Sequence, residues 1–240
     1  MKKVAYAIMI CLSLSACEGL QAVMKGRETI IDWVDFIKIH NREYNGIPTG
    51  VIASPRYIGR KIGTVQFKVS DNVTDPNYRI RNGDAAFWEK GTEIYAVKSA
   101  PALIAIKDKS AVNGYRVYYD VDEMEYGWHF KHMPQKQVRK IELYYVAYVE
   151  NGVQRRLIDR LEDEQQILQF IDLLNTGKNN ESFEPNTSKG DPLVFEAVFY
   201  TNEPVAYNYN IYFDGFTYYW HPWKTVTLFD GIGNYLQIKK

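Results

Sequence analysis

The sequence predicts an α+β fold in which antiparallel strands predominate, and three observations support this class. The chain contains 19 Tyr and 11 Phe residues, and aromatic side chains favour strands. Asn151-Gly152 and Asp214-Gly215 are turn sequences of the kind that joins antiparallel strands. Residues 163–177 show the apolar spacing of a core-facing helix. We therefore expect two small β-rich domains, the second with one amphipathic helix packed on its sheet.

Residues 28–132 are predicted to form the first β-rich domain. Residues 33–39 are dense in strand-forming side chains; some of the apolar residues here also have helical spacing, but we favour a strand. Asn41-Arg42 and Tyr44-Asn45-Gly46 have the composition of turns. Further strands are expected at residues 64–69, 93–97, 102–106 and 115–121.

Residues 133–240 are predicted to form the second domain, because the apolar pattern lapses at Met133-Pro134-Gln135. Strands at residues 138–149 and 154–158 flank the Asn151-Gly152 turn. After the helix, the polar composition of residues 178–190 predicts a mobile loop. Three final strands are expected at residues 193–201, 206–213 and 216–220.

The helix of the second domain is predicted with its ends. Asp163 can cap the first turn, and Gln166 follows three residues later in an approximate capping box. Gly177 is expected to end the helix as its C′ residue. The core-facing stripe consists of Ile167, Phe170, Ile171 and Leu174.

The N-terminus has the layout of a secretory signal peptide. Lys2 and Lys3 precede the apolar residues 4–14, and two small residues follow at 15 and 16. The apolar stretch is too short for a membrane-spanning helix. An ordinary secretory signal is one interpretation of this pattern.

A more specific interpretation rests on Leu14-Ser15-Ala16-Cys17, which resembles the lipobox of bacterial lipoproteins. The resemblance covers the first seventeen residues. It implies that residues 1–16 are removed and that Cys17 becomes a diacylglycerol cysteine carrying palmitate-type chains. Two acyl chains suffice for stable anchoring, so residues 17–27 would form a lipidated tether. Cys11 would be discarded, which leaves no thiol for a disulfide or a metal in the folded part.

Two further segments resemble uncharacterised cell-envelope lipoproteins of Gram-positive bacteria. They are Asn82-Gly83-Asp84 and Gly91-Thr92-Glu93-Ile94-Tyr95. Residues 138–235 are similar to small strand–helix–strand domains of the same group. This resemblance implies placement in the cell envelope and carries no activity with it.

The charge balance of the chain argues against nucleic-acid binding, and its hydropathy argues against a membrane-spanning segment after the signal peptide. The 29 basic residues equal the 29 acidic ones, whereas a general nucleic-acid binder needs a basic excess. No later segment has 18 uninterrupted apolar residues, so none is expected to span a membrane. We expect the chain at the extracytoplasmic face of the cell membrane, held there by the lipid on Cys17.

Several polar clusters could carry chemistry, but each has a plain structural interpretation. His129 and His132 lack a spacing typical of metal ligands, and a solvated connector explains them. The acidic run at 120, 122, 123 and 125 could bind Ca²⁺ through oxygen ligands, but it lacks the glycine of an EF-hand loop. His221 has no obvious catalytic partner in the sequence. No phosphate-cradling loop or dinucleotide fingerprint occurs, so no metal and no cofactor are expected.

The aromatic residues near the C-terminus are the best candidates for a ligand-binding face. Tyr212, Trp220 and Trp223 could form a platform of rings that binds sugars or peptide segments. Alternation along the strand places Tyr207, Tyr209, Ile211 and Phe213 on the core face, and Asn208, Asn210 and Tyr212 on the other. Aromatic pairs across strands also stabilise sheets without binding anything.

Two functions remain open from the sequence. The first is a non-catalytic binding or assembly module of the cell envelope, whose partner is an envelope protein or a glycan. The second is an envelope enzyme acting on peptidoglycan or another glycan, with Asp122 and Glu125 as acid and base. The missing catalytic motifs favour the first.

Overall fold

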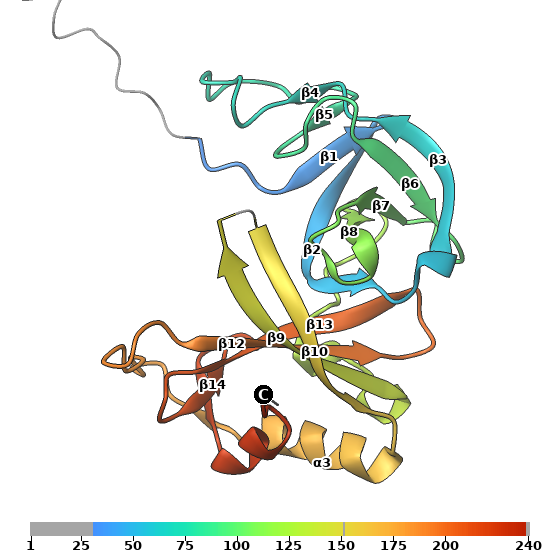
Figure 1. Cartoon of the computed structure of the whole chain (residues 1–240). Coiled ribbons are helices and arrows are strands. Elements are labelled where there is room, and N and C mark those ends of the chain that lie inside the picture. Colours follow the sequence, from blue (N-terminus) through green and yellow to red (C-terminus); the bar gives the residue numbers. More distant parts are fainter. Residues whose placement is uncertain (1–30, 151, 239–240) are drawn as a thin grey trace, which may run out of the picture.

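The computed structural model describes residues 31–150 and 152–238, and most of its regular structure is antiparallel sheet (Figure 1). The predicted class is confirmed: in these two described ranges, a mainly antiparallel sheet accompanies one α-helix. The predicted signal peptide, Cys17 and the tether to residue 27 lie outside the described residues. We use "first half" for residues 31–132 and "second half" for residues 133–238.

The strands of the first half are β1 (Phe36–Ile39), β2 (Arg42–Ile52), β3 (Ile58–Thr64), β4 (Phe67–Lys68), β5 (Asp84–Ala85), β6 (Glu93–Val97), β7 (Leu103–Lys107) and β8 (Tyr115–Asp120). Those of the second half are β9 (Lys140–Val149), β10 (Gly152–Leu161), β11 (Lys178–Asn179), β12 (Leu193–Tyr200), β13 (Val205–Phe213), β14 (Tyr218–Trp220) and β15 (Val226–Leu228), and the helix is α3 (Glu164–Asn175). Short 3₁₀ turns occur at Pro55–Tyr57, Val112–Gly114, Phe130–His132, Gln135–Gln137 and Asp230–Asn234.

One hydrogen-bonded path runs through both halves in the order β10-β9-β12-β13-β2-β8-β7-β6-β3. The halves meet where β13 pairs with β2, with Val205 opposite Ile52. Every pair along this path is antiparallel, and the short β4–β5 pair is parallel. The boundary predicted between residues 132 and 133 lies in the segment that joins β8 to β9. Whether the halves are separate domains stays a prediction.

Helix α3 packs on the second-half sheet, on the side away from the first half (Figure 1). The Asp163 side chain accepts a hydrogen bond from the Gln166 N–H at 3.0 Å, which confirms the predicted cap. All four residues of the predicted stripe are buried. They share one core with the inward faces of β9, β12 and β13, because alternate side chains of a strand point to the same face.

Gly177 follows the helix for a different reason from the one predicted. Thr176 is the C-cap, and Gly177 does not have the left-handed conformation that a glycine C′ residue usually supplies. A Cβ at Gly177 would instead lie 2.5 Å from Cγ1 of Val226 and 3.0 Å from the Thr227 carbonyl oxygen. The glycine therefore allows the chain to pass directly against β15.

The predicted hairpins form, but two of their turns occupy other residues than those predicted. Val149 pairs with Gly152 across the β9–β10 turn. Ile39 pairs with Arg42, and the two residues between them, His40 and Asn41, have φ values of 52° and 62°, as in a type I′ turn. The Asp214-Gly215 hairpin has a longer loop, because Phe213 pairs with Tyr218. The carboxylate of Asp214 accepts hydrogen bonds from the backbone N–H groups within this loop.

The turn predicted at residues 44–46 is wrong, because these residues lie inside β2. Gly46 occupies this strand because a Cβ there would meet the Asp35 carboxylate at 2.6 Å. Pro48 is tolerated because the register between β2 and β8 shifts between Gly46 and Val51, so no regular ladder is interrupted. The strand predicted at 64–69 is also largely wrong, since β3 ends at Thr64 and β4 covers two residues.

The remaining strand predictions are mostly confirmed. β6 matches its predicted bounds, and β1, β7, β8, β9, β12, β13 and β14 fall within a few residues of theirs. The prediction of a strand, rather than a helix, near residues 33–39 is confirmed by β1. The loop predicted at residues 178–190 contains no strand from residue 180 onward, but its first two residues form β11, which pairs with β15. Its mobility stays a prediction.

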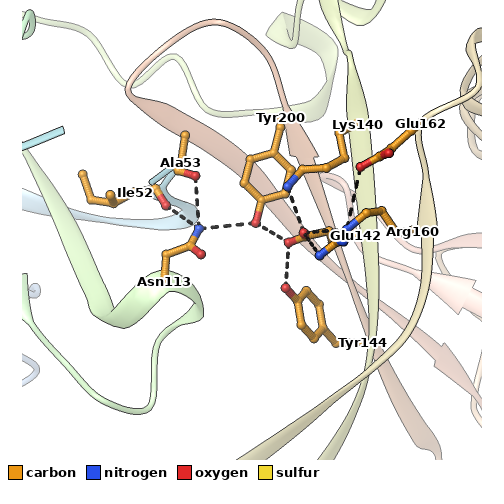
Figure 2. A network of polar contacts seen from close by, with 9 residues as sticks. All are labelled: Ile52, Ala53, Asn113, Lys140, Glu142, Tyr144, Arg160, Glu162 and Tyr200. Atoms are coloured by element: carbon orange, nitrogen blue, oxygen red, sulfur yellow. Dashed lines mark hydrogen bonds and ion pairs between the residues drawn. The ribbon is translucent and has the colours of Figure 1, made fainter. Parts of the chain in front are cut away.

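A buried polar network joins the halves on the other face of the second-half sheet (Figure 2). The Glu142 carboxylate accepts hydrogen bonds from Lys140 at 2.8 Å, Arg160 at 2.9 Å, Tyr144 at 2.7 Å and Tyr200 at 2.6 Å. Burial raises the pKa of Glu142, but the hydrogen bonds from Lys140 and the two tyrosines outweigh it and lower the pKa to about 2.

Asn113 extends this network into the first half. Its Nδ2 donates to the Ile52 carbonyl at 2.8 Å and lies 3.3 Å from the Tyr200 hydroxyl. Asn113 has a φ of 58°, a left-handed conformation that asparagine tolerates better than most residues. The amide thus links the end of β2 to the carboxylate cluster of β9.

Candidate functional site

Residues 121–133, which we call the connector, lead from β8 toward the second half and are held between the halves. The Trp128 carbonyl accepts hydrogen bonds from Thr49 Oγ1 at 2.6 Å and from the Tyr209 hydroxyl at 2.8 Å. The Tyr126 hydroxyl also contacts Thr49 Oγ1. Trp128, Phe130 and Met133 are buried. The segment therefore packs as part of the core and is not wholly solvated.

A cavity of about 470 Å³, which we call the junction cavity, lies beside the connector. Three segments line it: the β6–β7 turn with the start of β7, the connector, and the β12–β13 turn with the start of β13. The lining residues are Ser99, Ala100, Pro101, Ala102, Leu103, Met124, Glu125, Gly127, Trp128, Glu203, Pro204, Val205 and Tyr207. The volume and the mainly apolar lining are typical of ligand-binding pockets.

Among the described residues, the charged side chains on the wall of the junction cavity are two carboxylates. Glu125 comes from the connector and Glu203 from the β12–β13 turn. Both are exposed, and neither carboxylate makes an ion pair or a side-chain hydrogen bond within residues 31–150 and 152–238. The cavity therefore combines an apolar floor with an uncompensated negative rim.

The acidic run predicted as a possible Ca²⁺ site is divided among different roles. Asp120 is buried and accepts hydrogen bonds from Arg42 at 2.8 Å and from the Asp122 N–H at 3.0 Å. Glu123 pairs with the same Arg42. These two acids tie the end of β8 to the start of β2. Glu125 lines the junction cavity and Asp122 does not, so the structure does not place the proposed acid and base on one cavity wall.

The two connector histidines belong to a row of aromatic rings. The His129 ring lies 4.7 Å from Tyr126, 4.8 Å from Trp223 and 5.6 Å from His132. Burial and the nearby charges of His132 and Lys131 lower the pKa of His129. Within the described chain, no three His, Cys, Asp or Glu side chains are grouped as metal ligands would be.

The structure does not bring Tyr212, Trp220 and Trp223 together. Trp220 lies opposite Ile211 and is 1% exposed, because it belongs to the core beneath α3. Tyr212 lies opposite Tyr219 on the other face of the sheet, where the two rings stack at 5.2 Å. Trp223 is 76% exposed and contacts His129.

The division of β13 into two faces agrees with the predicted alternation. Tyr207, Tyr209, Ile211 and Phe213 pack in or against the core beneath α3. Tyr212 lines a separate polar cleft of about 400 Å³ together with His221. Burial lowers the pKa of His221, whose Nδ1 lies 3.1 Å from Thr225 Oγ1.

No family model, curated protein or solved structure matches this chain. Among the described helices, none is long and apolar enough to cross a lipid bilayer.

Two segments of the junction cavity were not singled out in the sequence. They are the turns at 99–103 and 203–205, which come from different halves. Pro101 and Pro204 mark both as turns, but only the pairing of β13 with β2 brings them to one cavity. The order of these two turns along the chain does not indicate that they meet at one cavity.

Proposed function

We propose that this chain is a lipid-anchored extracytoplasmic protein of a bacterial envelope that binds a partner protein without catalysis. The junction cavity would hold an apolar side chain of the partner, with a basic group of the same segment beside it. The observation that carries this proposal is the pairing of an apolar floor with the Glu125 and Glu203 carboxylates.

The lining favours a protein segment over a glycan. A sugar presents hydroxyl groups that need polar partners, whereas Ala100, Leu103, Met124 and Val205 offer only apolar contact. An apolar side chain in the cavity releases water from both surfaces, which is favourable by about 25 cal/mol per Å² of buried apolar area. The two carboxylates attract a basic neighbour and repel an acidic one, which provides specificity.

The test uses short synthetic peptides in which Leu or Phe stands next to Lys, Gln or Glu. The full-length chain in mild detergent is titrated with each labelled peptide, and binding is followed by fluorescence anisotropy. We expect the Lys peptides to bind at least about tenfold more tightly than the Glu peptides. The double substitution Glu125→Gln and Glu203→Gln should abolish this preference while the Gln peptides bind as before.

Two further variants separate the cavity from the rest of the surface. Ala100→Trp fills the cavity and should abolish binding of every peptide. Glu184→Gln removes an exposed carboxylate that makes no hydrogen bond or ion pair with the described residues, and it should change nothing. Equal binding of Lys and Glu peptides, or unchanged binding by Ala100→Trp, would contradict the proposal.

A further inference from the structure

A second recess, of about 250 Å³, lies on the first half next to the β1–β2 region and contains two opposite charges. Asp35 and Arg116 line it together with Val34, Gly46, Ile47, Pro48, Val117 and Tyr118. Arg116 and Pro48 also line the larger polar cleft, so the two spaces meet there. The recess does not include any residue of the junction cavity.

The Asp35 carboxylate is held in a directed chain of hydrogen bonds. The Trp88 indole N–H, which is a donor only, donates to the Tyr118 hydroxyl. The Tyr118 O–H therefore donates to Asp35, whose two carboxylate oxygens both lie 3.0 Å from it. Gly46 leaves room for this carboxylate, since a Cβ would come within 2.6 Å of Oδ2. The carboxylate is thus fixed by groups that carry no positive charge.

The guanidinium of Arg116 is oriented by Asp108, which does not line the recess. Its Nε donates to Asp108 Oδ2 at 2.7 Å, and Asp108 is itself fixed by the N–H and the hydroxyl of Ser110. No hydrogen bond from the two Nη atoms of Arg116 to another described residue occurs. The terminal nitrogens of the guanidinium therefore remain available to a ligand.

Asp35 and Arg116 influence each other without touching. Burial raises the pKa of Asp35, while the hydrogen bond from Tyr118 and the charge of Arg116 act in the opposite direction. Within the described residues, no ion pair joins these two side chains or gives Asp35 another cation. Arg155 and Glu196, which line the adjacent cleft together with Arg116, pair with each other.

We propose that this recess binds the zwitterionic end of an α-amino acid, with its ammonium against Asp35 and its carboxylate against the Nη atoms of Arg116. A ligand with one positive and one negative group fits between Asp35 and Arg116, because these two side chains carry opposite charges and do not form an ion pair with each other. The space suits such a small group, since one water occupies about 30 Å³ in the liquid. A longer ligand could continue into the polar cleft past Arg116, toward Asn210 and Tyr212.

The same zwitterion occurs in a free amino acid and at the side-chain end of a diamino acid within a wall peptide. Titrations of the ¹⁵N-labelled full chain, followed by NMR, compare both sources. The probes are alanine, a peptide with a free diaminopimelate side-chain end, and two blocked controls, alaninamide and N-acetylalanine. We expect alanine or the peptide to bind, and each blocked control to bind at least about tenfold more weakly. Binding of the peptide without alanine would identify the wall peptide as the source.

Variants test the two charges separately. Asp35→Asn keeps an acceptor for Tyr118 but loses the charge, and Arg116→Gln loses the guanidinium; each should weaken binding at least about tenfold. Asp191→Asn and Arg79→Gln change exposed residues elsewhere and should bind normally. Equal binding of alaninamide and alanine, or no binding of either zwitterion to the unmodified chain, would overturn the proposal whether or not the variants fold.

Discussion

Glu142 shows how one buried carboxylate can hold two parts of a sheet together. It is 5% exposed, yet two cations and two tyrosine hydroxyls surround it. Alternation along β9 places this residue on the face opposite the α3 core. The partner Tyr200 is 58 positions away in the chain, so only the pairing of β9 with β12 brings it close.

The depressed pKa of Glu142 predicts how stability depends on pH. Its ordinary value of 4.5 falls to about 2 in the folded protein, so the stabilisation is present above pH 4.5 and is lost as pH falls toward 2. The difference corresponds to about 3 kcal/mol of unfolding free energy. Urea denaturation between pH 7 and pH 2 measures it.

A matched pair of variants isolates this contribution. Glu142→Gln should lower the unfolding free energy at pH 7 by about 3 kcal/mol and should flatten its decline below pH 4.5. Glu184→Gln should match the unmodified chain throughout. An unchanged acid decline in Glu142→Gln would assign the pH dependence to other carboxylates.

At the scale of elements, the packing of the chain after α3 against β15 depends on Gly177, which lies between α3 and β11. Gly177 lies against Val226, Leu228 and the Thr227 carbonyl, and each of these would be within 3.0 Å of an added Cβ. Both Val226 and Leu228 are buried in the core that α3 covers. The close approach therefore leaves no space for a side chain.

Gly177→Ala should destabilise the protein although alanine is the better helix former. Displacing the chain from β15 should cost about 1–3 kcal/mol, as overpacking usually does, and lower the Tm by several degrees. Thermal unfolding followed by circular dichroism measures this shift. Gly127→Ala is the control, because its nearest neighbour would be 3.9 Å away. A Tm for Gly177→Ala equal to that of the control would refute the packing argument.

Strand β2 shows where prediction of elements fails. It contains Gly46, Pro48 and Gly50, and this composition is typical of turns. The glycines are required by contacts with Asp35, Ile47 and Val205, and the register shift accommodates the proline. None of these causes is local in the sequence, whereas α3 was predictable because its cap and its apolar stripe are both local.

At the scale of the whole molecule, side chains link the halves at several places besides the β13–β2 pairing. Arg155 of β10 binds Glu196 and also donates to the Ser110 carbonyl of the first half. The end of β9 and the start of β10 lie toward the first half (Figure 1). Thr49 and Arg155 line the polar cleft, and Thr49 also holds the carbonyl of Trp128, which lines the junction cavity.

The proposed anchor determines where this molecule would act, and one substitution tests it. Cys17→Ala removes the only thiol expected to remain once residues 1–16 are cut off. We expect the variant to incorporate no labelled fatty acid and to leave the membrane fraction, whereas Cys11→Ala should behave as the unmodified chain. Unchanged fatty-acid incorporation in Cys17→Ala would exclude lipidation at this residue.

The sequence by itself determined the fold class, the N-terminal cap and the buried face of α3, most strands and the two faces of β13. These follow from periodicity, caps and turn residues, which act over a few positions. Only the tertiary structure decided which turns line the junction cavity, why Gly46 and Gly177 are glycines, and how Asp35 comes to face Arg116. The physical reason is that pairing between distant strands creates these contacts, and local composition does not encode which strands will pair.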